Sequence, residues 1–205
     1  CFQPGSSWRY GVSTDVLGRI IEVITGRDLE GVLRERIFDP LKMTDTSFSV
    51  PDDKVSKFCA LYTRTTENPL KKLEDAESSR FRKPVVMNSG GGGLVSSMKD
   101  YVRFVEMIRR LGELDGERIL GRKTVNFMMR NHLPGDMASM GQKTFSEMPM
   151  TGVGFGLGGA VLLDPVKSEI IGSEGEFTWG GVASTAFWID PMEEISVVVM
   201  TQLVP

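Results

Sequence analysis

The sequence predicts an α+β fold in which helices come first and antiparallel strands come last. Apolar residues recur at helical spacing through much of residues 1–150, whereas residues 151–205 hold segments of strand length rich in glycine, β-branched and aromatic residues. Helices followed by consecutive strands are typical of an α+β domain and not of a parallel doubly wound sheet. We therefore expect residues 1–150 to be mainly helical, with an irregular insert near 41–87, and residues 151–205 to form antiparallel strands.

The first expected helix follows a loop that carries Tyr10. Ser13, Thr14 and Asp15 offer N-cap side chains, and Gly26 is placed to end the helix. Between these ends an apolar face repeats at i, i+3, i+4 and i+7, and consists of Leu17, Ile20, Ile21 and Ile24.

The rest of the helical part is less regular. Asp28 is expected to cap a second helix that ends before Pro40. From Leu41 to about Met87 there is little periodicity and much charge, which in a compact domain indicates a functional loop or an inserted lid. Periodicity returns in a helix that Gly112 stops, "LDGERIL" indicates a turn, and a further helix is expected around residues 125–129.

The last third of the chain is expected to contain the sheet. Its strand candidates lie in "GVGFGLGGAVLLD", "EFTWG", "ASTAFWID" and "ISVVVMTQ". "DPMEE" has the composition of a hairpin turn between the last two.

Composition narrows the classes of function. The net charge is only -3 and there is no basic stripe, so we expect no nucleic-acid partner. No apolar run is long enough for a membrane span, and no metal-ligand spacing or cofactor motif with the right context is present. Cys1 and Cys59 do not make a disulfide framework, so we expect reduced thiols and favour a cytoplasmic location. The chain opens on Cys1 and closes on a strand-like run, so we expect it to be part of a longer one.

Ser96 and Lys99 form a literal S-x-x-K, a spacing that places a nucleophilic serine and a lysine on one helical face in serine acyl-transfer enzymes. A second interpretation is structural and is the one we prefer. Ser97 with Asp100 forms an S-x-x-D capping pattern at the start of a helix, which leaves Lys99 facing solvent.

Two further patterns have structural interpretations. Gly154 to Gly159 form a G-x-G-x-x-G, but the following "AVLLD" reads as a strand, whereas a dinucleotide loop needs a helix there. The glycines are then expected to mark a bulge or a close backbone approach. His132 is the only histidine and follows an expected helix, so its expected role is to interact with the helix C-terminus.

Tyr10 and the Trp179-Gly180-Gly181 stretch are weak signals by themselves. Together with the order of the other motifs, however, the chain resembles the serine β-lactamase-like hydrolases, in particular class C β-lactamases and family VIII carboxylesterases. The segments that carry the resemblance span nearly the whole chain: "FQPGSSWRYGVSTDVLGRIIEVITGRDL", "RIFDPLKMTDTSF", "SGGGGLVSSMKDYVRF", "FGLGGAV" and "WGGVASTAFWIDPMEEISVVVMTQ".

The resemblance implies a β-lactamase/transpeptidase-like α+β fold, an antiparallel sheet flanked by helices, incomplete at both ends. It implies that Tyr10 is the catalytic base and that Trp179, Gly180 and Gly181 are the strand motif lining the site. It further implies that the backbone N–H of Val182 is an oxyanion-hole donor. A tyrosine acts as a base only beside cations that favour the phenolate, a charge that the lysine of the family's nucleophile motif supplies.

The sequence departs from the family pattern at three points. Val12 stands where the lactamases carry asparagine, and Trp179 stands where they carry lysine, so the resemblance favours esters over lactams. The family's nucleophilic S-x-x-K precedes the tyrosine, and the chain has no such motif before Tyr10. The implied partners are therefore a small ester or lactam substrate and an N-terminal segment of the same fold.

Three interpretations follow. The first is a portion of a serine hydrolase acting on small esters, with no cofactor and with its nucleophile outside these residues; a β-lactamase or D-peptidase-type amide hydrolase is its variant. The second is a self-sufficient enzyme that uses Ser96 and Lys99. The third is a non-catalytic module that binds a partner through the Leu41–Met87 stretch. We also expect an unpaired sheet edge and exposed apolar surface.

Overall fold

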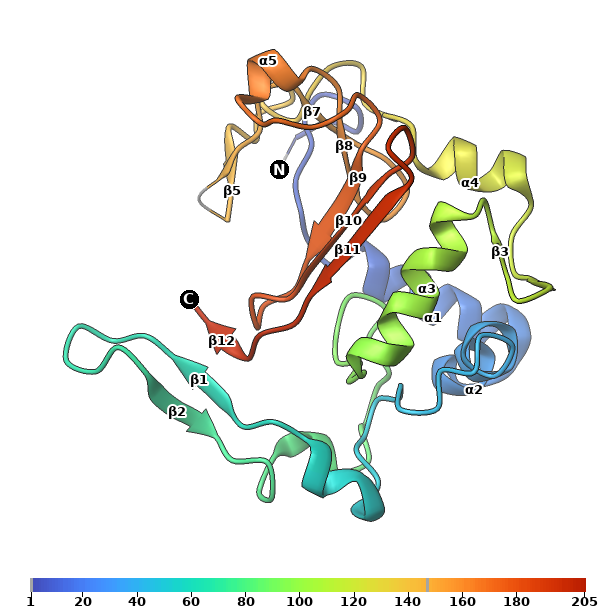
Figure 1. Ribbon diagram of the computed structural model, residues 1–205, viewed down its shortest axis with the longest axis vertical. Helices are drawn as coiled ribbons and strands as arrows, with labels where there is room; N and C mark the ends of the chain where they lie inside the picture. Colours follow the sequence, from blue (N-terminus) through green and yellow to red (C-terminus); the bar gives the residue numbers. More distant parts are fainter. Residues whose placement is uncertain (1, 147) are drawn as a thin grey trace. The chain divides into compact units, whose positions relative to one another are not determined.

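The computed structural model describes residues 2–146 and 148–205 and divides the chain into two compact units (Figure 1). The first unit comprises the residues up to Gly11, Val105–Trp179 and Phe187–Val197. The second comprises Val12–Phe104, Gly180–Ala186 and Val198–Pro205. Each unit thus draws on both ends of the chain.

The first unit contains most of a five-stranded sheet whose strands lie in the order β11-β10-β9-β8-β7. These strands are β7 (Val153–Phe155), β8 (Ala160–Leu162), β9 (Phe177–Gly180), β10 (Ala186–Asp190) and β11 (Ile195–Val199). β8 pairs antiparallel with β7 and with β9. The expected run of consecutive strands is confirmed.

The turn predicted at "DPMEE" joins β10 to β11. The Asp190 side chain accepts hydrogen bonds from the backbone N–H groups of Met192 (2.8 Å) and Glu193 (3.1 Å). An aspartate that binds the backbone two residues ahead stabilises such a turn, which is why the composition alone identified it.

Glycines bring β7 and β8 close to their neighbours, as expected from the G-x-G-x-x-G pattern. A Cβ atom at Gly159 would lie 2.6 Å from the Phe177 ring, and one at Gly156 would lie 2.3 Å from the Met128 carbonyl oxygen. The segment between the two strands is a hairpin connection and not the start of a helix. The dinucleotide interpretation is therefore excluded by context.

Short elements complete the first unit. They are β3 (Glu113–Leu114), β4 (Glu117–Arg118), α4 (Arg122–Met128), β5 (Thr144–Phe145), β6 (Met148–Pro149) and α5 (Pro165–Ser168). The turn expected in "LDGERIL" is the β3–β4 hairpin. α5 was not expected, although Asp164 caps it by accepting from the N–H groups of Val166 and Lys167, and Pro165 begins it.

The second unit contains α1 (Ser13–Thr25), α2 (Leu29–Leu33) and a π-helical turn (Arg34–Phe38). Gly26 ends α1 in the left-handed region with φ 66°, and Asp28 caps α2 by accepting from the Gly31 N–H at 2.8 Å. Both predictions are confirmed. The helix α3 (Met98–Arg109) begins in this unit.

The predicted N-cap of α1 is wrong. Val12 occupies the N-cap without a side-chain hydrogen bond, and Ser13, Thr14 and Asp15 lie in the first turn. The Asp15 carboxylate instead accepts a hydrogen bond from the Ser89 hydroxyl. A tertiary partner thus replaces the local cap, an outcome that local sequence does not reveal.

The stretch from Leu41 to Met87 is less irregular than expected. It contains two 3-10 turns (Asp52–Lys57 and Arg80–Arg82) and an antiparallel hairpin of β1 (Leu61–Thr63) and β2 (Lys71–Glu74). β12 (Leu203–Val204) pairs in parallel with β1 to make a three-stranded sheet. The C-terminal strand β12 therefore pairs with a hairpin from the middle of the chain.

The face of α1 that packs within the second unit is its glycine face. Gly18 is buried, and a Cβ atom at Gly90 would lie 2.0 Å from the Thr14 carbonyl oxygen. The predicted apolar face is instead exposed, with exposed fractions of 55% for Leu17, 45% for Ile20, 36% for Ile21 and 78% for Ile24. The expectation of exposed apolar surface is confirmed.

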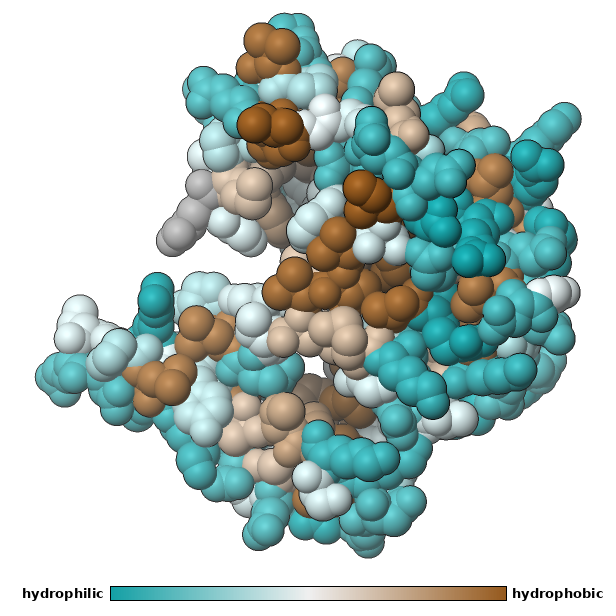
Figure 2. Space-filling view, in the orientation of Figure 1, coloured by the Kyte–Doolittle hydropathy of each residue, from teal (hydrophilic) through white to brown (hydrophobic). Residues whose placement is uncertain are grey.

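The edge of the five-stranded sheet is apolar as well. β11 is the end strand in the part of the chain that the structure describes, and Ile195 and Val199 at its two ends are exposed. Figure 2 shows hydrophobic side chains gathered over this strand. An exposed apolar edge strand is a surface on which another chain segment can pair.

Candidate active site

Tyr10 lies at the end of an N-terminal segment that is tied to the first unit by its backbone and by a guanidinium group. The Trp8 N–H donates to the Met140 carbonyl oxygen at 2.8 Å. The Arg9 side chain donates to the Gly141 carbonyl oxygen at 2.8 Å and to the Gln142 side chain at 3.0 Å. These bonds fix the path of the chain into Tyr10.

The Tyr10 ring belongs to a group of aromatic rings, the aromatic cluster, which consists of Trp8, Tyr10, Phe145, Phe155 and Trp179. All of them lie in the first unit. Tyr10 lies 5.4 Å from Trp179 and 5.2 Å from Phe145, measured between ring centroids. Trp179 lies 5.1 Å from both phenylalanine rings. Contacts of this kind add about 0.5–1.5 kcal/mol each beyond the area that they bury.

The aromatic cluster packs against the apolar core of the first unit. That core consists of Met137, Met150, Val153, Ala160 and Leu162. The rings of Trp8, Phe145, Phe155 and Trp179 pack against it, whereas Tyr10 has 49% of its surface exposed. The structure thus holds the rings in place while leaving the phenol accessible to a ligand.

The Tyr10 hydroxyl makes no hydrogen bond to any residue that the structure describes. Its position therefore depends on the ring contacts and on the backbone path that the Trp8 and Arg9 hydrogen bonds fix. The nearest cation along the chain is Arg9, whose guanidinium is already engaged by Gly141 and Gln142. A phenol that is to act as a base needs a cation to stabilise its phenolate, and that charge has to come from another group.

Trp179 precedes the turn that joins β9 to β10. Within the second unit, the Gly181 N–H donates to the Thr185 carbonyl oxygen at 2.8 Å, and the Ser184 N–H donates to the Gly181 carbonyl oxygen at 3.1 Å. The Gly181 N–H is therefore engaged in the turn. Gly180 leads into it, with the site of a Cβ atom 3.2 Å from the Thr185 carbonyl oxygen, so the backbones approach closely.

The Val182 N–H has no acceptor among the described residues, and 75% of the Val182 surface is exposed. A backbone donor that no protein group engages is what an oxyanion hole requires. Two further hydrogen bonds, from the Leu203 N–H (3.2 Å) and the Thr201 hydroxyl (2.8 Å) to the Ala183 carbonyl oxygen, hold the same turn against the C-terminal residues. The role of Val182 stays a prediction.

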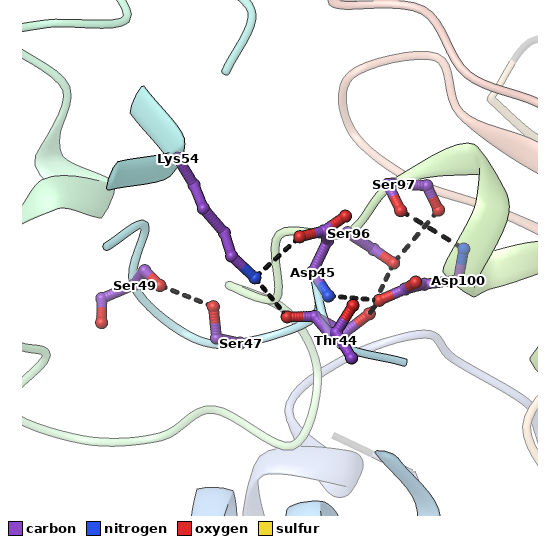
Figure 3. Close-up of polar contacts among 9 residues, drawn as sticks. Thr44, Asp45, Ser47, Ser49, Lys54, Ser96, Ser97 and Asp100 are labelled. Carbon is purple, nitrogen blue, oxygen red and sulfur yellow. Dashed lines mark hydrogen bonds and ion pairs between the residues drawn. The ribbon is translucent and has the colours of Figure 1, made fainter. Parts of the chain in front are cut away.

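Ser96 is held in a hydrogen-bond network in the second unit and is not arranged as a nucleophile (Figure 3). Its hydroxyl is 2.8 Å from the Thr46 hydroxyl, which donates to the fully buried Asp100 carboxylate at 2.9 Å. Ser96 also precedes α3, so it does not share a helical face with Lys99. No hydrogen bond joins Ser96 to Lys99 in the described residues.

The capping interpretation is confirmed. The Asp100 N–H donates to the Ser97 hydroxyl oxygen at 3.3 Å, at the start of α3 (Figure 3). The Asp100 carboxylate additionally accepts from the Asp45 N–H at 2.6 Å. Asp100 is therefore a buried anchor that ties α3 to residues 45 and 46, and Lys99 is exposed.

His132 interacts with the end of α4, as expected. Its Nε2 donates to the Phe127 carbonyl oxygen at 2.8 Å, and its ring lies 4.5 Å from the Phe127 ring. Satisfying one of the last carbonyls of a helix is a structural role. Among the described residues no group of histidine, cysteine, aspartate and glutamate side chains could hold a metal ion.

Glu106 has the most strongly shifted carboxyl of the first unit. Arg109 binds it through two hydrogen bonds of 2.9 Å and, with a hydrogen bond from Ser196, lowers the pKa of Glu106 to about 2 against the opposing effect of burial. Glu106 and Arg109 both lie on α3, so their ion pair is local to that helix, whereas the hydrogen bond from Ser196 of β11 links the helix to a strand.

A cavity of about 470 Å³ lies in the second unit. Its walls include apolar residues of the Leu41–Met87 stretch (Phe48, Phe81, Val85 and Met87) and Lys83. Glycines of the run that begins at Gly90 form another wall. Asp15 and Arg80 also line it, so the cavity combines apolar walls with side chains of both charges. Its size is that of a site for a small ligand.

In the described residues no helix is long and apolar enough to cross a membrane. Cys59 is an exposed free thiol, and the expectation for Cys1 lies outside the described residues.

Sequence reasoning missed most of the aromatic cluster. Phe145 and Phe155 stand far from Tyr10 in the sequence, and no local pattern relates them to it. Asn131 was also missed. Its side chain accepts from the N–H groups of Leu133 (3.1 Å) and Phe155 (3.0 Å) and so positions β7 beneath the rings. An asparagine after a helix was the only signal.

Comparison with known proteins gives the family. The model of the β-lactamase family matches residues 2–205. Curated relatives include lovastatin esterase from Penicillium rubens, 30% identical over 92% of this chain and 49% of that protein. They also include esterase EstB from Burkholderia gladioli, 28% identical over 98% of this chain and 50% of that protein. The chain spans about half the length of these relatives.

Solved structures show the fold. EstCE1, described as a hydrolase with promiscuous acyltransferase activity, superposes with a TM-score of 0.82 at 29% identity, over 99% of this chain and 53% of its own. The LovD6 mutant of simvastatin synthase from Aspergillus terreus gives 0.84 at 27% identity, over 99% and 51%. The predicted β-lactamase/transpeptidase-like α+β fold is confirmed.

Proposed function

Because the chain belongs to the β-lactamase family, we propose that it is a portion of a serine hydrolase that cleaves small esters through an acyl-enzyme, with the nucleophile outside these residues. The observation that carries the proposal is the contact of the Tyr10 and Trp179 rings, 5.4 Å apart in the first unit. Tyr10 and Trp179 come from two separate motifs, and their rings lie in one cluster that leaves the Tyr10 phenol accessible. The names of the esterase relatives favour an ester as substrate.

The proposed reaction assigns one role to each group. The Tyr10 phenolate takes the proton of a serine hydroxyl as that oxygen attacks the ester carbonyl carbon. The tetrahedral oxyanion is stabilised by the Val182 N–H, and loss of such a donor typically costs about 10²–10³ in rate. The phenol then protonates the departing alkoxide. Water next attacks the acyl-serine while the Tyr10 phenolate takes a proton from it, and the phenol returns that proton to the serine oxygen as the acid leaves. Trp179, Gly180 and Gly181 line the site.

Three observations support a nucleophile outside these residues. Ser96 is engaged by Thr46 in the network around Asp100 and does not meet Lys99. The apolar face of α1 is exposed, as is the edge strand β11. Burying such surface against a further segment of the same fold would stabilise both. We therefore propose an N-terminal segment of the fold, carrying a serine and a lysine, as the partner of this chain.

Val12 and Trp179 favour an ester over a lactam. Val12 is 71% exposed and offers no side-chain amide, and Trp179 offers no ammonium group to a substrate carboxylate. A site without those polar groups has little with which to recognise the amide and carboxylate of a lactam antibiotic. Amide hydrolysis of the β-lactamase or D-peptidase type is the alternative within the same mechanism.

Complementation tests the proposal. An N-terminal segment of the fold with its S-x-x-K is added to the chain as a separate polypeptide, and p-nitrophenyl acetate hydrolysis is measured. We expect activity only when both parts are present and expect Tyr10→Phe to lower it by about 10²–10⁴-fold. Tyr62→Phe is the matched control, because Tyr62 lies on β1 in the second unit and should leave activity unchanged. Undiminished activity in Tyr10→Phe would refute the assignment of the base.

The cavity beside the Leu41–Met87 stretch favours a second candidate function, a non-catalytic binding module. A small apolar anion would place its charge at Lys83 and its apolar part against Phe48 and Phe81. Butyrate titrated into the chain by calorimetry tests this candidate. Binding that survives Tyr10→Phe and Trp179→Ala but is lost in Lys83→Ala would favour it over the hydrolase.

A further inference from the structure

Phe145 contacts both of the rings that the proposed function uses. Its ring stacks on Trp179 with 5.1 Å between centroids and 29° between planes. It meets Tyr10 edge-on, at 5.2 Å and 71°. Trp8 lies farther away, at 6.4 Å. Phe145 thus contacts the Tyr10 phenol ring and the Trp179 indole ring simultaneously. All of these rings lie in the first unit.

Phe145 is also the only inward-facing residue of its ladder. Among the paired residues of β5 and β6, Thr144, Met148 and Pro149 are exposed, whereas Phe145 is half-buried and packs against the core of the first unit. The Met150 N–H donates to the Lys143 carbonyl oxygen at 3.0 Å and closes the base of the hairpin. Of these four paired residues, only Phe145 contributes its side chain to the interior.

We propose that Phe145 is a positioning and specificity residue of the Tyr10 site, and that the ester it selects carries an apolar chain of several carbons. This inference rests on the proposed function. The Tyr10 hydroxyl has no hydrogen bond in the described part of the chain, so its ring partners set the direction in which the phenol points. Removing Phe145 leaves one side of the phenol ring without support.

The surface around Phe145 is apolar and accessible, which gives the substrate class. Tyr10 is 49% exposed and Met148 is 52% exposed. The rings that contact Phe145 are those of Trp8, Tyr10 and Trp179. An apolar wall favours the longer of two acyl chains, and the gain reaches about 10-fold or more per methylene only where a pocket encloses it. The expected substrates are therefore butyrate-like or larger esters in preference to acetates.

The experiment compares p-nitrophenyl butyrate with p-nitrophenyl acetate, using the chain complemented by the N-terminal segment. We expect Phe145→Ala to lower kcat on both substrates, because the phenol is no longer held, and to raise KM for butyrate. The preference for butyrate over acetate should fall by about 10-fold. Phe145→Tyr, which keeps the ring, should restore the preference. Phe127→Ala is the control, since Phe127 is an exposed phenylalanine of α4.

A binding measurement separates this inference from the proposed reaction. The ketone 1-phenylpentan-2-one has the shape of phenyl butyrate and cannot be hydrolysed, and its binding is followed by the fluorescence of the tryptophans. We expect Phe145→Ala to weaken binding to the chain by about 10-fold and Phe127→Ala to leave it unchanged. Ketone binding that depends on Phe145, without hydrolysis, would uphold the inference while the proposed function failed. An unchanged substrate preference in Phe145→Ala, or ketone binding that is absent or independent of Phe145, would overturn it.

Discussion

The rings of Tyr10 and Trp179 lie 5.4 Å apart, with 42° between their planes, although they stand near opposite ends of the chain. The N-terminal segment brings the first ring, and strand β9 brings the second. This contact brings together Tyr10 and Trp179, which are weak signals when each is read by itself in the sequence.

In the complemented protein, Tyr10→Phe should lower kcat by about 10²–10⁴-fold, the range typical for the loss of a general base. The melting temperature should stay nearly unchanged, because the hydroxyl makes no hydrogen bond in the described residues and the ring contacts are kept. Steady-state kinetics check the predicted loss of kcat, and a thermal melt on the same samples checks the predicted melting temperature. A comparable loss of stability would show that the hydroxyl serves the fold instead.

Asp100→Ala should lower the free energy of unfolding by about 2–4 kcal/mol, because it leaves two donors without their acceptor. These donors are the Asp45 N–H and the Thr46 hydroxyl. Urea denaturation measures the loss. Lys99→Ala is the matched control on the same helix and should change the free energy by less than about 0.5 kcal/mol, since Lys99 is exposed. A large effect of Lys99→Ala would call for a role that the structure does not give it.

Glu106 should make stability depend on pH in the acid range. Arg109 holds the pKa of Glu106 at about 2 in the folded chain, below the ordinary value of 4.5. A lowered folded pKa means that its stabilisation is complete above the ordinary value and is lost as the pH falls toward 2. Between pH 6 and pH 3 this loss should amount to about 2 kcal/mol.

Urea denaturation at several pH values checks this prediction by comparing the wild type with Glu106→Gln. The variant should be less stable at pH 6 and should lose less stability on acidification. Glu117→Gln, at an exposed residue of β4, should retain the wild-type pH dependence. Identical pH profiles for wild type and Glu106→Gln would contradict the assigned role of the pair formed with Arg109.

The exposed face of α1 should make the isolated chain associate. Ile24 and Leu17 are 78% and 55% exposed on one helical face. Replacing them with glutamate (Leu17→Glu with Ile24→Glu) should reduce self-association in analytical ultracentrifugation and should also weaken complementation by the N-terminal segment. The same pair of substitutions with unchanged complementation would show that this face is not where the segment binds.

The sequence predicted the order of helices and strands well where the signal is local. Gly26 and Asp28 marked helix ends through backbone conformation and capping, and the "DPMEE" turn followed from the aspartate that binds its own backbone. The Ser97–Asp100 cap was predicted for the same reason. Each of these features is set by residues within a few positions of one another.

Features that depend on tertiary partners could not be predicted. Asp15 looked like a cap, but Ser89 captures its carboxylate. The hairpin of β1 and β2 has no clear strand pattern and is held by β12 from the end of the chain. Phe145 carries no local sign of its contact with Tyr10, because the ring geometry arises only from folding.

The most direct test of the central claim, that the nucleophile lies outside these residues, is fluorophosphonate labelling of the isolated chain together with its hydrolysis of p-nitrophenyl acetate. Ser96→Ala is assayed beside the wild type. We predict no labelling and no turnover above background for either protein. Labelling and turnover by the wild type that Ser96→Ala abolishes would contradict the claim, because the chain would then carry its own nucleophile.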